Sequence, residues 1–375
     1  MPLYLNDEQT MLRDTAKDFI AEHAPVGHLR SLRDGNDPTG FSRDLWKQFA
    51  EMGLNGVLIP EAQGGLGLGH VEAGVVLEEI GRNLSPSPFL ATAVAAVEAL
   101  KGSAQADRWF PGIVAGETVA ALAIDESAKH RNRIAMTAER SGNGFRLTGA
   151  KQFVTHGHVA DLLIVAARTA GSPDDAEGVT LFAVPKDAAN LTATPERLAD
   201  SSLAARIAFE GVEVDADAVI GEVDGGRGPL DRLLRAGRTG AAAELLGVGG
   251  GAMDMTIGYM KQRKQFGTLI GSFQALQHRA AHLYSEMEVA RAAVLKAQQL
   301  LDTGHDKADE AVSVAKAMTA LATTLSVQES VQMHGGIGMT DEYDIGFYMK
   351  RARVLAELFG DANFHADRLA IAAGY

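Results

Sequence analysis

The chain has 375 residues, with 48 Asp and Glu against 35 Lys and Arg, which gives a formal net charge of −13. Nucleic acids and anionic lipids bind through clustered Lys and Arg, so this balance argues against both as partners. At 46% hydrophobic and 22% charged residues, the composition is that of a globular protein, and the length suggests roughly two or three domains. Cysteine is absent, which excludes disulfides, thiolate metal ligands and a cysteine nucleophile.

The N-terminal residues, MPLYLNDE, lack the basic start and the apolar run of a signal peptide. No stretch approaches the ~18 uninterrupted apolar residues that a membrane helix needs. We therefore expect a soluble cytoplasmic protein that makes no contact with a membrane.

The first part of the chain predicts helices separated by loops. Asn6 and Asp7 can cap a helix, and apolar residues follow them at helical spacing. The same spacing recurs further on, whereas the glycines of segment 64–69 interrupt it. This pattern predicts an N-terminal all-helical domain over residues 1–117, with helices at 42–53, at 70–83 and from Pro88.

From about residue 118 the pattern changes to short β-branched and aromatic runs bounded by Gly, Pro, Asp and Asn, which is typical of strands. The sequence SGNG at Ser141–Gly144 predicts a turn between two of these strands. The runs end near residue 225. We expect residues 118–225 to form an antiparallel β-sheet domain.

The sequence after the glycine-rich GEVDGGRG segment is again helical and predicts a bundle over residues 226–375. Stripes rich in Ala and Gly at 239–264 and 308–333 allow helix backbones to approach closely. Between them, apolar residues recur at alternating steps of four and three, as in the seam of a bundle helix; they are Leu276, Ala280, Leu283, Met287, Ala290, Val294 and Ala297. Helices, then a sheet, then long helices indicate an α+β chain.

Three glycine clusters lie at 64–69, 247–251 and 335–338. None of them follows a predicted strand and opens a helix, and no G-K-[ST] occurs, so the Rossmann and P-loop interpretations are excluded. We interpret the first two clusters as turns and close helix contacts.

Other catalytic and metal-binding patterns are missing. His156 and His158 lie at alternate positions that point to opposite faces, and no third ligand is near, so no metal site is predicted. No G-x-S-x-G elbow or recognisable triad favours hydrolysis.

Two C-terminal segments are more specific. One runs from Arg263 through Phe266 and Gly267 to Gln274, and the other is Gln332–Gly338. Arginine, amide side chains and exposed glycine backbone are the groups that bind a pyrophosphate and an adenine or ribose edge. The alternative is a capped helix end with a solvated basic face, formed by Lys350, Arg351 and Arg353.

Together with PEAQGGLGLG, LEEIGR and KQFVTHG, these segments resemble the acyl-CoA dehydrogenase family over essentially the whole chain. The resemblance implies that a helical domain, a β domain and a C-terminal four-helix bundle enclose FAD, usually in a homotetramer. It implies that Phe153 and Thr155 contact the isoalloxazine. It also implies that the adenosine and pyrophosphate are held across a subunit boundary by Arg263, Phe266, Gln274, Gln332, Gly335 and Gly336.

The activity implied by the resemblance is α,β-desaturation of an acyl-CoA, with electron-transfer flavoprotein as acceptor. A carboxylate removes the α-proton while a β-hydride passes to flavin N5. The family places that Glu at one of two positions, and the matching positions here hold Phe359 and Gly237. The flavin- and acyl-contacting T-E-P…G-S-D segment is also altered, at residues 123–130.

Two carboxylates are weak substitutes for the missing base. Glu244 lies two turns after Gly237, ~10 Å further along a continuous helix. Asp361 follows Phe359 by two residues. For both carboxylates, an ordinary role at the surface or as a helix cap is favoured over a role as general base. Three hypotheses stay open: a dehydrogenase with a displaced base, an FAD-binding subunit that pairs with a Glu-bearing homologue in a heterotetramer, and a flavin-free helical binding protein.

Overall fold

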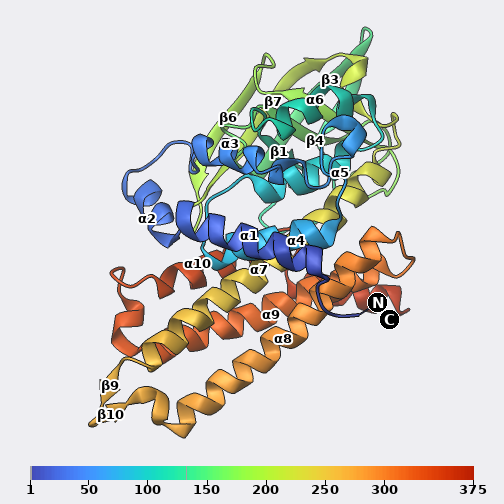
Figure 1. Cartoon of the computed structure of the whole chain (residues 1–375). Helices are drawn as coiled ribbons and strands as arrows, with labels where there is room; N and C mark the ends of the chain where they lie inside the picture. The colour runs from blue at the N-terminus through green and yellow to red at the C-terminus, as the bar shows by residue number, and fades with distance from the viewer. Residues whose placement is uncertain (1, 132) are drawn as a thin grey trace. The chain divides into compact units, whose positions relative to one another are not determined.

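The computed structural model describes residues 2–131 and 133–375 and contains both helices and strands (Figure 1). The chain forms two compact units, each assembled from stretches that are separated in the sequence. Unit 1 comprises Met1–Ser31, His70–Pro86 and Arg238–Tyr375, and unit 2 comprises Leu32–Gly69 and Ser87–Gly237. Within the described ranges, no helix is both long and apolar enough to cross a membrane.

Unit 1 consists mainly of long helices. Its first helix begins where the sequence predicts, because the Asn6 side chain accepts from the Gln9 N–H at 2.8 Å and the Gln9 side chain accepts from the Asn6 N–H at 3.0 Å. The helices of this unit are α1 (Asp7–His23), α4 (His70–Arg82), α8 (Gln274–Asp302), α9 (Ala308–His334), α10 (Ile345–Glu357) and α11 (Ala362–Ala372). Two further helices, α2 (Val26–Asp34) and α7 (Arg227–Met260), continue from one unit into the other.

The helices α8 and α9 pack along each other (Figure 1). The seam predicted for α8 is confirmed from Leu283 to Ala297, where its residues are buried. The core of unit 1 also includes Leu245 and Val248 from α7 with Phe347 and Leu355 from α10. Two short strands, β9 (Lys264–Gln265) and β10 (Thr268–Leu269), form an antiparallel hairpin between α7 and α8.

Glycines allow α4 and α7 to cross at close range. A Cβ on Gly247 would lie 1.8 Å from the Glu78 carbonyl oxygen, and one on Gly81 would lie 2.1 Å from the Glu244 carbonyl oxygen. Both distances are far below van der Waals contact, so only glycine fits at either position. The interpretation of cluster 247–251 as a close helix contact is confirmed.

The helices of unit 2 are short. Its α-helices are α3 (Arg43–Glu51), α5 (Val97–Leu100) and α6 (Ala104–Val114); three 3₁₀ turns lie at Leu54–Gly56, Glu61–Gln63 and Ala216–Ala218. The helix predicted from Pro88 is a π-helical stretch, Leu90–Ala96, that continues into α5. Within it, the Thr92 hydroxyl donates to the Ala120 carbonyl and accepts from the Ala120 N–H, both at 3.0 Å, which ties this stretch to the sheet.

The sheet of unit 2 is mainly antiparallel and has the order β6-β7-β3-β2-β4-β5-β8, with β1 beside β4. The predicted SGNG turn joins β2 to β3. Two pairings differ from the expected antiparallel arrangement: β1 and β2 each pair with β4 in parallel. The strands are β1 (Ala120–Ala123), β2 (Thr137–Ser141), β3 (Gly144–Thr155), β4 (Leu162–Arg168), β5 (Val179–Pro185), β6 (Leu191–Arg197), β7 (Leu203–Val214) and β8 (Val219–Ile220).

The α+β architecture of N-terminal helices, central sheet and C-terminal helical bundle is confirmed. The helical region predicted to follow the GEVDGGRG segment begins slightly earlier, because α7 begins at Arg227, inside that segment. Pro229 lies in the first turn of α7, where a missing N–H costs no hydrogen bond, so the GGRGP sequence opens the helix rather than preceding it.

Candidate functional site

A β-bulge in β3 turns Phe153 out of the sheet. The pairing of β3 with β7 shifts register between Lys151 and Val154, and Phe153 adopts φ of 54° with 39% of its surface exposed. A positive φ is unusual for a bulky residue and often marks a site of function. Thr155, half-buried, resumes the pairing opposite Ala204. The two residues predicted to contact the isoalloxazine therefore flank the end of this bulge.

An ion pair that includes a fully buried lysine begins at the residue where the bulge starts. Lys151 is fully buried, and its Nζ donates to Glu126 Oε1 at 2.6 Å. Burial lowers the pKa of Lys151, and Glu126 opposes that shift. The Gln152 N–H donates to the Asp125 carbonyl at 2.8 Å. The altered segment 123–130 is thus held against β3 beside Phe153.

The β9–β10 hairpin presents the first predicted adenosine-binding segment to solvent. Phe266 stands at its tip with φ of 52° and 95% exposure, and its ring lies 6.4 Å from that of Phe273. Arg263 is exposed and opens the hairpin; its carbonyl accepts from the Ile270 N–H at 2.9 Å. Gln274, also exposed, is the first residue of α8.

The second predicted segment ends α9. Gln332 is exposed in the last helical turn, and Gly335 caps the helix with φ of 64° and ψ of −142°, a conformation nearly restricted to glycine. A Cβ built on Gly335 or Gly336 meets no protein atom within 4 Å. The glycine backbone is therefore open to a ligand and is not required by close packing.

Three aromatic rings bring the two segments to the same end of the bundle. The His334 ring stacks on Tyr259 near the end of α7 at 4.5 Å, and Tyr343 lies 4.9 Å from His334 and 6.0 Å from Tyr259. Burial lowers the pKa of His334. Tyr259 was missed by sequence reasoning, because no motif distinguishes it from a core aromatic residue. His334 lies inside the segment Gln332–Gly338, but no role was predicted for its ring.

These residues fit an FAD dinucleotide. An exposed Arg, two exposed amide side chains and open glycine backbone converge on one end of unit 1, and they supply the donors that a pyrophosphate and an adenosine require. Phe153 and Thr155 belong to unit 2 and offer an exposed aromatic surface at a bulge.

Arg263→Ala is expected to weaken FAD binding about 10- to 100-fold, because a hydrogen bond to a charged group contributes about 1.5–3 kcal/mol. The measurement is a titration of the apoprotein with FAD followed by flavin fluorescence. Lys261→Ala, which removes an exposed cation two residues away, is the control. Equal affinities for the two variants would contradict the assignment of Arg263.

The first position that the resemblance aligns with the family's base, Phe359, lies in a constrained turn between α10 and α11. Phe359 is buried, with φ of 60°, and its carbonyl accepts from Arg238 Nε at 3.2 Å. At Gly360, φ is 109° and a Cβ would lie 2.3 Å from the Phe364 ring, so glycine is required. The second position aligned with the family's base, Gly237, precedes Arg238 within α7.

Both substitute carboxylates make structural contacts. Glu244 is 2% exposed, and its Oε1 accepts from Arg351 at 3.0 Å (Nε) and 2.5 Å (Nη2). Asp361 is the N-cap of α11, where its side chain accepts from the Phe364 N–H at 2.8 Å. Arg351 is therefore not part of a fully solvated basic face.

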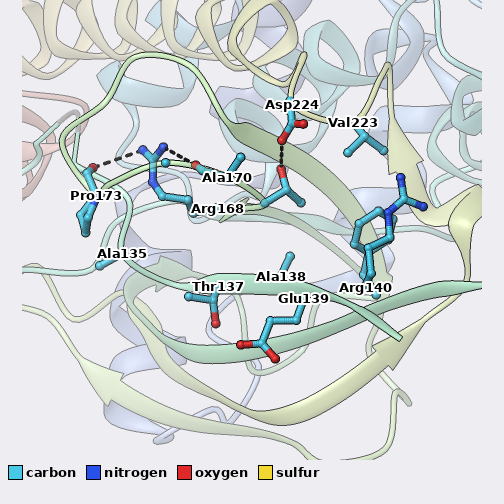
Figure 2. A pocket seen from close by; sticks show the side chains of 13 residues that line it. Ala135, Thr137, Ala138, Glu139, Arg140, Arg168, Ala170, Pro173, Val223 and Asp224 are labelled. Atoms are coloured by element: carbon cyan, nitrogen blue, oxygen red, sulfur yellow. Dashed lines mark hydrogen bonds between the residues drawn. The ribbon is translucent and has the colours of Figure 1, made fainter. Parts of the chain in front are cut away.

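A cavity of about 470 Å³ in unit 2 is separate from these residues (Figure 2). Arg168 lies at its wall and donates to five backbone carbonyls, among them Ala170 at 3.2 Å and Pro173 at 3.2 Å. Asp224 accepts from the Thr169 hydroxyl at 2.6 Å. Because all five donors of Arg168 are used inside the protein, this side chain offers none to a ligand.

The two histidines that follow β3 contact different residues. His156 packs edge-on against Phe41 at 5.0 Å, and His158 Nε2 lies 2.9 Å from the Pro38 carbonyl oxygen. Among the described residues, no group of three His, Cys, Asp or Glu side chains is placed to hold a metal ion.

Three family models match successive parts of the chain. Residues 6–117 match the acyl-CoA dehydrogenase N-terminal domain, residues 125–212 the middle domain and residues 225–374 the C-terminal domain. The chain belongs to the acyl-CoA dehydrogenase family. This family comprises oxidoreductases that act on CH–CH bonds and generally bind FAD.

Individual proteins resemble the chain over nearly its full length. Acyl-CoA dehydrogenase FadE12 of Mycobacterium tuberculosis (strain ATCC 25618 / H37Rv) is 30% identical over 93% of this chain and 91% of its own. The structure of a variant of the Tcur3481-Tcur3483 steroid ACAD is 32% identical, with a TM-score of 0.88 over 98% of both chains. The ChsE4-ChsE5 complex from Mycobacterium tuberculosis is 26% identical, with a TM-score of 0.90 over 100% of both chains.

Proposed function

We propose that this chain is an FAD-binding acyl-CoA dehydrogenase subunit that acts beside a homologous subunit carrying the general base. The observation that carries the proposal is that both substitute carboxylates are engaged: Glu244 pairs with Arg351, and Asp361 caps α11. A general base needs a carboxylate oxygen within reach of the proton that it removes. The positions that would supply one hold Phe359 and Gly237.

The residues of this chain bind and orient the cofactor. Phe153 and Thr155 would contact the isoalloxazine, while Arg263 and the backbone at Gly335 and Gly336 would hold the pyrophosphate across a subunit boundary. When bound, FAD would accept the β-hydride of the acyl-CoA at N5. A base supplied by a homologous subunit would take the α-proton in the same reaction.

Two resemblances support a two-component assembly and a bulky substrate. The ChsE4-ChsE5 structure is described as a complex, and the Tcur3481-Tcur3483 structure as a steroid ACAD. We therefore propose a heterotetramer with a homologue, acting on a steroid-derived CoA thioester, with electron-transfer flavoprotein as electron acceptor.

Anaerobic flavin bleaching tests this proposal. The chain, purified alone and after co-expression with a Glu-bearing homologue, is mixed with CoA thioesters of increasing bulk. We expect yellow protein in both preparations and bleaching only in the complex. Bleaching at full rate by the chain alone would overturn the proposal.

Variants of the two substitute carboxylates distinguish the subunit hypothesis from the hypothesis of a displaced base in this chain. Glu244→Gln and Asp361→Asn are expected to leave bleaching by the complex within about a factor of three, whereas loss of a true base costs about 10²- to 10⁴-fold. A loss of that size in either variant would identify a displaced base. Colourless protein that takes up no FAD would instead favour a flavin-free binding module.

A further inference from the structure

A fully buried lysine lies under the turn that joins α10 to α11. Lys316 comes from the N-terminal half of α9, which packs against both of these helices. Its side chain is 0% exposed, and its Nζ donates to the Ala356 carbonyl at 2.9 Å and to the Gly360 carbonyl at 3.0 Å. One amine from α9 therefore holds the end of α10 and the turn that follows it.

Arg238 holds the same segment from α7. Its Nε donates to the Phe359 carbonyl at 3.2 Å, so two basic side chains bind the carbonyls of three residues in the segment 356–360. We call Leu358–Gly360 the 358–360 turn. Both Phe359 and Gly360 have a positive φ in it; glycine adopts this conformation freely, whereas at Phe359 it persists only where surrounding contacts impose it.

The charges around Lys316 oppose one another. Arg238 repels its ammonium form, whereas Asp361 and Glu357 attract it. The fully buried His365 also interacts with this group, and Arg368 adds a further positive charge near His365. Burial is the largest influence and, together with Arg238, lowers the pKa of Lys316 to about 7.

We propose that Lys316 is the positioning residue of the 358–360 turn. The amine of Lys316 holds the backbone that presents residue 359, and the turn opens more readily when this amine is charged. The consequence for catalysis rests on the proposed function, in which residue 359 stands where the family's base would be. The hydrogen bonds by which Lys316 and Arg238 hold the turn lie entirely within unit 1.

The direction of the pH effect follows from proton linkage. An opened turn admits water to Lys316 and returns its pKa toward the ordinary value of 10.5, so opening takes up a proton between about pH 7 and that value. The closed turn is therefore increasingly favoured as the pH rises through this interval, by up to about tenfold per pH unit. Below about pH 7, opening no longer changes the protonation of Lys316 and the dependence ends.

Amide hydrogen exchange of the full chain, measured between about pH 6 and about pH 9 and corrected for intrinsic rates, tests the proposal. In the wild type, protection of peptides covering the 358–360 turn is expected to rise with pH above about 7. Lys316→Met is expected to abolish this rise and to lower protection at high pH, because two carbonyls lose their donor. Lys307→Met, which removes an exposed lysine of the same chain, is the control and is expected to behave like the wild type.

A pH-independent wild-type profile, or a Lys316→Met profile identical to that of the wild type, would overturn the proposal. If Lys316→Met fails to fold, Lys316→Gln and the wild-type profile still decide the question. The exchange measurement needs no acyl-CoA. Failure to bleach flavin would thus contradict the proposed function and leave this result unaffected.

Discussion

Replacing Phe359 by glutamate is expected to make the flavin of the isolated chain bleach with acyl-CoA about 10²- to 10⁴-fold faster than in Phe359→Gln. The substitution places a carboxylate at the position that the resemblance aligns with the family's base. Stopped-flow absorbance under anaerobic conditions measures the rate. The effect is large because a general base contributes to the chemical step itself.

The turn is already shaped to present this side chain. Arg238 donates to the residue 359 carbonyl, Lys316 donates to the Gly360 carbonyl, and Gly360 supplies the backbone conformation that no other residue can adopt without striking Phe364. In the Phe359→Glu variant, the positive charge of Arg238 lies near the buried carboxylate and lowers the free-energy cost of burying it.

Phe359→Gln is the matched control, since it has the shape of glutamate without the charge. Phe359→Leu tests whether loss of the phenyl ring alone alters flavin binding. If the glutamate and glutamine variants bleach at the same rate, the turn does not stand at the α-carbon of the substrate, and the alignment of Phe359 with the family's base is wrong.

Arg351→Met is expected to destabilise the folded chain by about 3–5 kcal/mol, because it leaves the buried carboxylate of Glu244 without a partner. The Glu244 side chain is 3% exposed and that of Arg351 is 24% exposed, so water screens the pair poorly. Equilibrium unfolding by urea, followed by circular dichroism, measures the loss.

The control lies on the same helix. Arg353 pairs with Glu357 at 3.1 Å, but its side chain is 73% exposed, so Arg353→Met is expected to cost at most about 1 kcal/mol. The double variant Glu244→Met with Arg351→Met is expected to recover most of the stability, because neither charge is then left buried alone. A small loss in Arg351→Met would mean that Glu244 is available for another role.

Much of the fold can be predicted because helix caps and apolar periodicity, which are visible in the sequence, mark the long helices. Asn6 caps α1 through a reciprocal bond with Gln9, and the apolar seam of α8 is buried from Leu283 onward. Both signals act over one or two helical turns, where spacing along the chain determines which side chains meet. The start of α7 lies inside the glycine-rich segment rather than after it, because Pro229 is favourable in a first helical turn although the glycines beside it are typical of a loop.

The candidate site was predicted less completely. The motifs named the segments around Arg263 and Gly335, but the stack of Tyr259 on His334 that joins them has no sequence signal. The substitute bases were ranked by their distance along a helix, which does not reveal that Arg351 binds Glu244.

The sequence by itself determined the order of helices, sheet and bundle, the family motifs and the absence of a carboxylate at Phe359 and Gly237. Only the tertiary structure decided how Glu244 and Arg351, 107 positions apart, neutralise each other, and how Lys316 comes to hold the 358–360 turn. The reason is physical. Periodicity and capping depend on neighbours along the chain, whereas the environment of a buried charge depends on which distant helices pack around it.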